Sequence, residues 1–359
     1  MFYLVNGLLL TIASMGFNSK RVENIIYRML WIYLTVILCI RYGQGTDYFG
    51  YYMNYTKGDA HSEYLWKTVT EILFKAGIRF EIFVAIIGLT SMILIDICIR
   101  KYSVNKCFSL LILYPTIYFV YLFSGIRMGL VIAIFMGILV PLLDEKKYLL
   151  YYLLCICLFF VHSATLIFLF IPFFVRLART KQILIVIMSF IFGMVLCYMP
   201  ATVFYSLNIG ALQFYIDERG IGIFALLEKV LILMLVVLFY KKSDIFSGIL
   251  FYTVAVSFMT ISWQFISSRF FVLGGCVYII LLSNIPRQQN KRENAVILWG
   301  VIVIYSILVL CKNVDAYLIQ NSLNNITIFN CPYITIFNKT DYNEILEKMG
   351  YYKMLFRTE

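Results

Sequence analysis

The apolar segment YLLYYLLCICLFFVHSATLIFLFIPFFV, residues 148–175, decides how this chain is arranged across a membrane. It is longer than the roughly 20 residues that cross the hydrocarbon core once, but too short for two full spans. The polar pair His162 and Ser163 stands near its middle. The segment therefore forms either one long helix or two short helices that meet at this pair. Each short helix would have about 14 residues and a length of about 21 Å.

Basic residues in the flanking loops distinguish these two arrangements. The loops before the segment hold Lys20, Arg21, Arg28, Arg100, Lys101, Lys106, Lys146 and Lys147, and those after it hold Arg176, Arg179, Lys181, Lys241, Lys242, Arg287, Lys291 and Arg292. A single crossing would place the two groups on opposite faces of the membrane, whereas a fold-back places both on one face. Basic loop residues are usually concentrated on the cytoplasmic face, which favours the fold-back. We therefore predict a broken or re-entrant helix pair near residue 162, with protein or a water-filled cavity around the break.

Composition places the whole chain in a membrane. Of its 359 residues, 62% are hydrophobic and 14% are charged, and the mean hydropathy is +0.87. Soluble proteins have about 45–50% apolar and about 25% charged residues. We predict an all-α polytopic helical bundle with about 10–12 transmembrane segments. The expected full spans lie near residues 2–17, 24–41, 80–99, 106–123, 127–143, 183–199, 221–240, 245–262, 266–285 and 295–312.

Several classes of function are disfavoured by the sequence. The net charge of +11 comes from small basic clusters between apolar runs, which are orientation signals, so we expect no nucleic-acid partner. The cysteines form no CxxC pair and indicate neither a disulfide framework nor a metal site. The sequence contains no P-loop, GxGxxG or HExxH motif. We therefore expect no cofactor, and any energy for a reaction has to arrive with an activated substrate.

The fold-back assigns a side to every loop. Residues 1–312 form one transmembrane domain, with outer loops at 42–79 and 200–221 and an extracytoplasmic tail at 313–359. The short turns at 124–127 and 262–269 also face outward. Each of these four outer segments carries an arginine near a helix end, namely Arg41, Arg127, Arg219 and Arg269. One such arginine is explained by snorkelling to the interface. Four converging arginines suit a diphosphate better, because the guanidinium fork binds phosphate oxygens in pairs.

Other outer residues have a chemical and an ordinary interpretation. His162 is either a core histidine bonded to a carbonyl or a general base that lines a polar cavity. In RYGQGTDYFGYYMNY, residues 41–55, Asp47 is either a catalytic carboxylate or an ion-pair partner of Arg41. The tyrosines of this stretch either stack on a sugar or form an interfacial belt.

Two further features complete the set of candidates. The segment SEYLWKTVTEILFKAG, residues 62–77, has one apolar and one polar helical face, and we expect it to lie in the outer interface. Glu228 and Lys229 fall inside a predicted span. Ionisable residues are costly there and are suspected of a function.

These residues, in this order, resemble the EpsG family of Wzy-like bacterial polysaccharide polymerases. The segment 124–135 departs from the family pattern at two positions, where Met128 stands in place of the usual Gln and Val131 in place of the usual Ala. Because methionine is a poor hydrogen-bonding residue, Met128 weakens any hydrogen-bonding role of that position. The resemblance rests on RYGQGTDYFGYY (41–52), which is similar to the R-x-x-x-G-x-D-Y-x-x-Y block, on SGIRMGLVIAIF (124–135), FFVHSATLIF (159–168), SSRFF (267–271) and CPYITIF (331–337).

The resemblance implies a glycosyltransferase of the bacterial cytoplasmic membrane that works on its extracytoplasmic side. It would join repeat units of a capsule, exopolysaccharide or O-antigen. The implied partners are an undecaprenyl-diphosphate-linked glycan as donor and acceptor, membrane lipid, and a chain-length regulator protein; no metal or nucleotide is required. The residue roles that follow are diphosphate binding by Arg127 and Arg269 with Arg219 or Arg41, base catalysis by His162 or Asp47, and sugar binding by Tyr48, Tyr51, Tyr52 and Ser163.

Two other functions are compatible with such a sequence. A flippase or transporter for lipid-linked oligosaccharides would also contain intramembrane charges, but its polar residues would be spread through the bilayer depth. A membrane glycan O-acyltransferase could use His162 as base, although its acyl donor usually comes from the cytoplasm.

Overall fold

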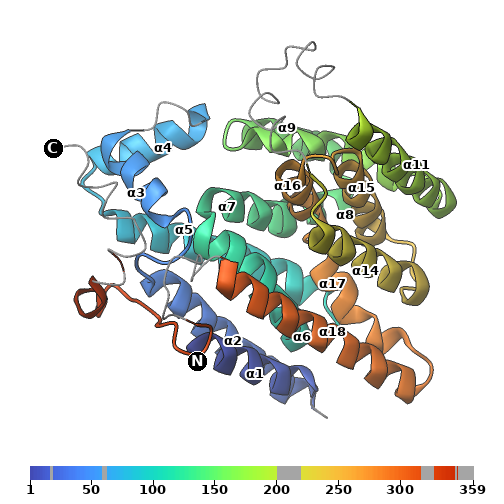
Figure 1. Ribbon diagram of the computed structural model, residues 1–359, viewed down its shortest axis with the longest axis horizontal. Helices are drawn as coiled ribbons and strands as arrows, with labels where there is room; N and C mark the ends of the chain where they lie inside the picture. Colours follow the sequence, from blue (N-terminus) through green and yellow to red (C-terminus); the bar gives the residue numbers. More distant parts are fainter. Residues whose placement is uncertain (17–18, 59–62, 200–219, 317–326, 344–345, 347–359) are drawn as a thin grey trace.

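The computed structural model describes residues 1–16, 19–58, 63–199, 220–316, 327–343 and 346, and this part of the chain is helical (Figure 1). Within the described residues there is no strand, although two isolated backbone bridges join Arg41 to Thr335 and Gly220 to Trp263. The predicted all-α fold is therefore confirmed.

The first half of the chain supplies the centre of the bundle and one flank. The joined helices α6 and η1 are almost fully buried, because other helices surround them on all sides. The elements of this half are α1 (Phe2–Ser14), α2 (Lys20–Ile40), α3 (Tyr48–Lys57), α4 (Tyr64–Lys75), α5 (Phe80–Tyr102), α6 (Lys106–Leu113), the π-helix η1 (Tyr114–Ser124), α7 (Ile126–Ile134), the π-helix η2 (Phe135–Leu139) and α8 (Val140–Asp144).

The second half packs against the other side of α6, η1 and α7. Figure 1 shows α11 at the edge of the molecule and α14 to α18 beside the central helices. The elements are α9 (Tyr148–Phe159), the 3₁₀ helix η3 (Ser163–Phe170), α10 (Ile171–Val175), α11 (Arg179–Tyr198), α14 (Ile223–Phe239), α15 (Ile245–Met259), α16 (Gln264–Gly275), α17 (Tyr278–Asn284), the 3₁₀ helix η4 (Pro286–Gln288), α18 (Arg292–Val314) and the 3₁₀ helix η6 (Lys339–Tyr342).

Many of these helices have the length and hydropathy of membrane spans. Among the described residues, 6 continuous helices qualify, and the pair α16 and α17, bent by 60°, raises the number to 7. Shorter apolar helices accompany them, and α1, α9 and α15 belong to this group. The chain is therefore a multi-pass helical membrane protein. The qualifying helices are Lys20–Ile40, Phe80–Tyr102, Lys106–Ser124, Ile126–Asp144, Arg179–Tyr198 and Arg292–Val314.

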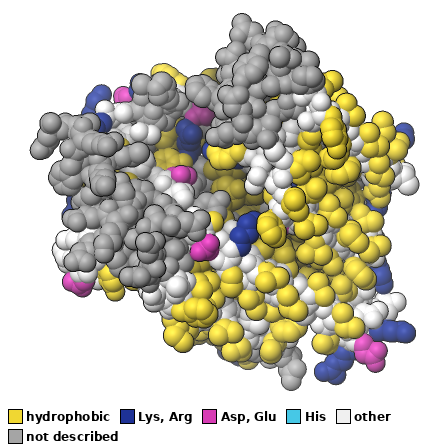
Figure 2. Space-filling view, in the orientation of Figure 1, with side chains coloured by type: hydrophobic (Ala, Val, Ile, Leu, Met, Phe, Trp, Pro, Cys, Tyr) yellow, Lys and Arg dark blue, Asp and Glu magenta, His cyan; other side chains and the backbone are white. Residues whose placement is uncertain are grey.

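The surface of the bundle is apolar where these helices face outward. Hydrophobic side chains cover the face that carries α11, α14 and α18 (Figure 2). On α11, Leu184, Ile187, Met188 and Ile191 are all exposed. Such a continuous apolar surface needs a hydrocarbon environment.

The segment 148–175 doubles back, as its flanking charges predict. The hydroxyl of Tyr151 in α9 donates to the carbonyl oxygen of Phe168 in η3 at 2.7 Å. The guanidinium carbon of Arg176, beyond the second arm, lies 4.5 Å from the ring centroid of Tyr148, at the start of the first. Both ends of the segment therefore meet, and the break at His162 lies at the far end. The second arm differs from the expected α-helix, because it begins as the narrower and longer 3₁₀ form.

The two groups of basic residues accordingly meet at one end of the bundle. Arg287, after α17, lies 3.5 Å from Glu23 near the start of α2. Lys106, at the start of α6, donates to Asn24 at 2.7 Å. Residues from before and after the fold-back therefore share one face.

The opposite end gathers the loop after α2, the turn after η1 and the C-terminal segment. Gly45 has φ +101°, and a Cβ built on it would lie 2.8 Å from the Cα of Ser124. Only a glycine allows this close approach without strain. The backbone N–H of Tyr42 donates to the carbonyl oxygen of Ile334 at 3.0 Å, which joins the C-terminal segment to the same loop. A helix is present as α4 within the predicted range 62–77, and its interfacial position stays a prediction.

Candidate functional site

A cluster of four polar residues joins α4, α7 and the break of the fold-back. Glu63 is the N-cap of α4, and Arg127 is the second residue of α7. One oxygen of Glu63 lies 2.5 Å from Nη1 of Arg127. Its other oxygen accepts the N–H of Ser163 at 2.9 Å and the hydroxyl of Ser163 at 3.2 Å, and lies 4.0 Å from Nδ1 of His162. We call Glu63, Arg127, His162 and Ser163 the Arg127 cluster.

Glu63 is held in its charged form. Burial opposes ionisation, but the backbone N–H of Ser163 and the guanidinium of Arg127 outweigh it, so the pKa of Glu63 lies below its usual value. A further hydrogen bond, from the N–H of Leu65 to the carbonyl oxygen of Phe160 at 3.0 Å, fixes the start of α4 to the break. The carboxylate therefore connects two parts of the chain that are far apart in the sequence.

His162 caps η3 in an extended conformation, with φ −156° and ψ 111°. Its Nδ1 accepts the N–H of Ala164 at 3.3 Å. A ring nitrogen that accepts a hydrogen bond carries no proton, so the neutral ring has its proton on Nε2. The imidazole is buried, with 7% of its surface exposed. In this arrangement His162 can donate a hydrogen bond from Nε2 to an oxygen of a bound molecule.

The two arginines of the site differ in their surroundings. Nε of Arg127 is buried and has no hydrogen-bond acceptor within the described part of the chain. The guanidinium of Arg269 lies 3.8 Å from the ring centroid of Phe265 and is partly exposed. Its charge acts on both His162 and Tyr51, as does that of Arg127. The structure therefore brings both arginines near the same histidine.

Asp47 and Tyr51 stand beside Arg127. The backbone N–H of Asp47 donates to the hydroxyl of Ser124 at 3.3 Å. A Cβ on Gly125 would lie 3.8 Å from the exposed Asp47 carboxylate. Gly125 precedes Arg127 by two residues, so Asp47 lies beside the start of α7. Tyr51 is partly buried, and its ring centroid lies 6.2 Å from that of Trp66 in α4.

Other predicted site residues lie elsewhere. Arg41 is fully buried, and each of its three guanidinium nitrogens donates to a carbonyl oxygen, those of Leu122, Phe123 and Leu38. Tyr48 is buried, and Tyr52 packs edge-on against Phe80 with ring centroids 5.4 Å apart. The aromatic residues of this loop thus mainly join α3 to α5. Arg219 lies outside the described residues.

Glu63 was missed by the sequence interpretation. Its position at the start of the amphipathic segment indicated no more than a polar cap. Its partners are 64 and 100 residues further along the chain, and no local pattern links positions so far apart.

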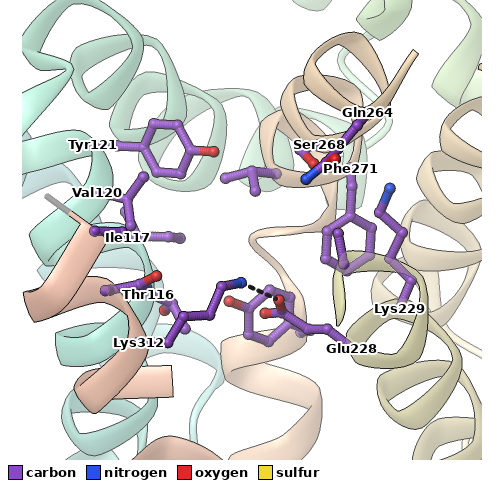
Figure 3. Close-up of a pocket in the computed structure, with 15 residues that line it drawn as sticks. Thr116, Ile117, Val120, Tyr121, Glu228, Lys229, Gln264, Ser268, Phe271 and Lys312 are labelled. Carbon is purple, nitrogen blue, oxygen red and sulfur yellow. Dashed lines mark ion pairs between the residues drawn. The ribbon is translucent and has the colours of Figure 1, made fainter. Parts of the chain in front are cut away.

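A cavity of about 400 Å³ lies between η1, α14, α16 and α18 (Figure 3). Figure 3 shows Glu228 and Lys312 meeting at one side of this cavity, and Tyr121 facing the side that carries Gln264 and Ser268. The distance from Nζ of Lys312 to the Glu228 carboxylate is 3.8 Å. Ser268 also precedes Arg269 directly, so the cavity adjoins the second arginine of the site.

The comparison with protein families agrees with this arrangement. A model described as the EpsG family matches residues 24–335. The chain belongs to the EpsG family. The matched range contains the whole Arg127 cluster, Arg269 and the cavity of Figure 3. Comparisons with curated proteins and with solved structures gave no match. Membership of the EpsG family, together with the apolar helices, supports a membrane protein of the polysaccharide polymerase type.

Among the described residues, no three His, Cys, Asp or Glu side chains are grouped as metal ligands would be. What the EpsG site does offer is two arginines, a neutral imidazole and two carboxylates near one another. Such a set can bind oxyanions, donate a hydrogen bond to a developing charge and accept a proton.

Proposed function

We propose that this EpsG protein polymerises oligosaccharide repeat units carried on undecaprenyl diphosphate, on the extracytoplasmic side of the bacterial cytoplasmic membrane. The observation that carries the proposal is the buried Nε of Arg127, which has no acceptor among the described residues, beside His162 and within the influence of Arg269. A diphosphate oxygen would supply this acceptor.

The reaction needs no other activation, because a sugar bonded to diphosphate through C1 already has a good leaving group. A hydroxyl of the acceptor glycan attacks C1, the bond from C1 to the diphosphate oxygen breaks, and the hydroxyl proton passes to a base. Arg127 and Arg269 would stabilise the departing diphosphate. In the tautomer described above, Nε2 of His162 would donate to the same leaving group, and Asp47 would take the proton.

Binding of the diphosphate also explains the place of Glu63. The Glu63 carboxylate forms an ion pair with the guanidinium of Arg127. A diphosphate carries more negative charge than a carboxylate and offers more oxygens, so it would displace Glu63 from Arg127. Ser163 of the Arg127 cluster and the nearby Tyr51 would contact the sugars. Undecaprenyl chains and lipid would contact the apolar surface, and a chain-length regulator protein would be a further partner.

The test is reconstitution with defined lipid-linked repeat units, followed by separation of the glycans by size. Wild-type protein should build a ladder of longer products. Arg127→Gln should lower the rate by about 10²–10³, by analogy with loss of one oxyanion donor. Lys242→Gln, a change outside the site, is the matched control and should leave the rate unchanged. A protein that binds these substrates and builds no ladder would refute the proposal.

One observation favours a second function. Glu228 and Lys229 in α14, and Lys312 in α18, border a cavity within helices that belong to the membrane bundle. A transporter of lipid-linked oligosaccharides would use such a cavity. If labelled substrate crosses vesicles that contain the protein, and no product grows, the transporter function replaces the polymerase.

A further inference from the structure

The cavity beside α16 has a surplus of positive charge. Its lining includes two lysines, Lys229 and Lys312, and a single carboxylate, Glu228. Glu228 already accepts a hydrogen bond from the Tyr305 hydroxyl at 2.9 Å and stands 3.8 Å from Lys312. One lysine of the cavity therefore has no matching carboxylate in its lining.

Lys229 is that lysine. Its side chain is 4% exposed, its Nζ donates to the hydroxyl of Ser267 at 2.5 Å, and it lies 5.7 Å from the ring centroid of Phe271. No carboxylate stands within ion-pair distance of it in the described part of the chain. Its hydrogen-bond partner Ser267 is neutral, and the nearest carboxylate to act on it, that of Glu228, is shared with Lys312. A buried ammonium group without a carboxylate of its own is unfavourable in a membrane, and an anion bound in the cavity would compensate it.

The rest of the cavity lining suits a ligand that carries many hydroxyl groups. The side chains of Gln264 and Ser268 make no hydrogen bond within the described residues. Both border the cavity from α16, and Thr116 and Tyr121 border it from η1 (Figure 3). Phe271 adds an aromatic face. Amide and hydroxyl groups can both donate to and accept from sugar hydroxyls. A volume of about 400 Å³ lies in the range of small-molecule sites and exceeds the need of a lone inorganic anion.

We propose that this cavity binds an acidic sugar of the glycan, that is, a sugar that carries a carboxylate or phosphate group. The proposal rests on the polymerase function and specifies its substrate class. Lys312 would bind the acidic group, and the charge of Lys229, whose amine lies beyond the Phe271 ring in Figure 3, would add to the attraction. The side chains from η1 and α16 would bind the ring. Because Ser268 directly precedes Arg269, an acidic sugar seated here belongs to the part of the glycan near the diphosphate.

The proposal is tested by binding to purified protein in nanodiscs of phosphatidylcholine. The probes are a short oligosaccharide with a terminal glucuronate, the same oligosaccharide as its neutral methyl ester, and the matching sugar phosphate. Microscale thermophoresis measures the affinities. Wild-type protein should bind the two acidic probes about tenfold more tightly than the ester, as expected for hydrogen bonds to a charged group.

Substitutions assign this preference to the cavity. Lys312→Gln should remove most of this tenfold preference. Glu228→Gln should increase it, because the competing carboxylate is removed. Lys229→Gln should abolish it, and since Lys229 is buried, the exposed Lys312 provides the test if that variant does not fold. Lys242→Gln, with the same chemical change outside the cavity, should leave all affinities unchanged.

Equal affinity for acid and ester, or a preference that all the lysine variants keep, would overturn the inference. A second result would also overturn it. If nanodiscs of phosphatidylglycerol prevented the acidic probes from binding to wild-type protein, and Lys312→Gln removed this competition, the cavity would hold a lipid headgroup. The polymerase assay separates the two proposals. If the protein polymerises neutral repeat units and shows no preference for acidic probes, the polymerase function stands and the acidic-sugar site is refuted. If it binds acidic probes specifically but forms no ladder, the polymerase function is refuted and the acidic-sugar site stands.

Discussion

Replacing Arg41 should lower stability and leave chemistry intact, although Arg41 and Arg127 look alike in the sequence. The guanidinium of Arg41 is fully buried and donates to three backbone carbonyl oxygens, those of Leu38, Leu122 and Phe123. In Arg41→Gln, the shorter amide can replace at most one of these contacts. Each carbonyl left without a donor costs about 1–3 kcal/mol, so the variant should lose about 2–6 kcal/mol of stability.

The assay is thermal melting of detergent-purified protein, followed by size-exclusion chromatography, with the polymerase rate measured per folded molecule. Arg41→Gln should melt at a lower temperature and keep its specific rate. Arg127→Gln is the matched variant, because the partly exposed Arg127 should affect stability little and the rate strongly. If Arg41→Gln melted like wild type and lost its activity, Arg41 would belong to the reaction site and our assignment would be wrong.

Three further predictions follow from the loop, the cluster and the fold-back. Gly45→Ala should destabilise the protein by about 1–3 kcal/mol, measured by melting, because φ is +101° and the new Cβ would meet Ser124; an unchanged melting temperature would contradict this. Since the pKa of Glu63 is lowered in the folded protein, its contribution should be complete above pH 4.5, the ordinary value, and be lost as the pH falls below it. Hydrogen exchange in α4 should report that loss, and Glu63→Gln should remove the pH dependence. Single cysteines at Lys147 and Arg179, in a cysteine-free background, should react with an impermeant maleimide from the same side of sealed vesicles, and labelling from opposite sides would refute the fold-back.

The fold was predictable because two simple constraints act along the whole chain. Apolar runs have to match the thickness of the hydrocarbon, and each expected span between residues 2 and 312 contains a helix in the structure. The fold-back at His162 followed from the distribution of basic residues on both sides, and the contact of Arg176 with Tyr148 bears it out. The 3₁₀ form of the second arm was not predictable, because no periodicity in SATLIFLF separates it from an α-helix.

The candidate site was predictable only in part, because the sequence does not show in which direction a long side chain points in the fold. Arg41 and Arg127 both stand at helix ends, yet Arg41 turns to carbonyl groups more than 80 residues away in the chain, and Arg127 turns to the carboxylate of Glu63. The tyrosine-rich loop was ambiguous for the same reason, and the burial of Tyr48 was not visible in the sequence. Glu63 became visible only once α4 was placed against the break at His162.

The hairpin formed by α9, η3 and α10 also bears on how the protein enters its membrane. The hairpin returns to the membrane face from which it starts, so it does not change which side the chain is on. As a result, α11 begins on the side where α8 ends. The part carried to the far side is a three-residue connection, Phe160 to His162, so no hydrophilic loop has to be translocated. A shortened or lengthened hairpin would therefore preserve the orientation of every later helix and alter only the depth at which the imidazole stands.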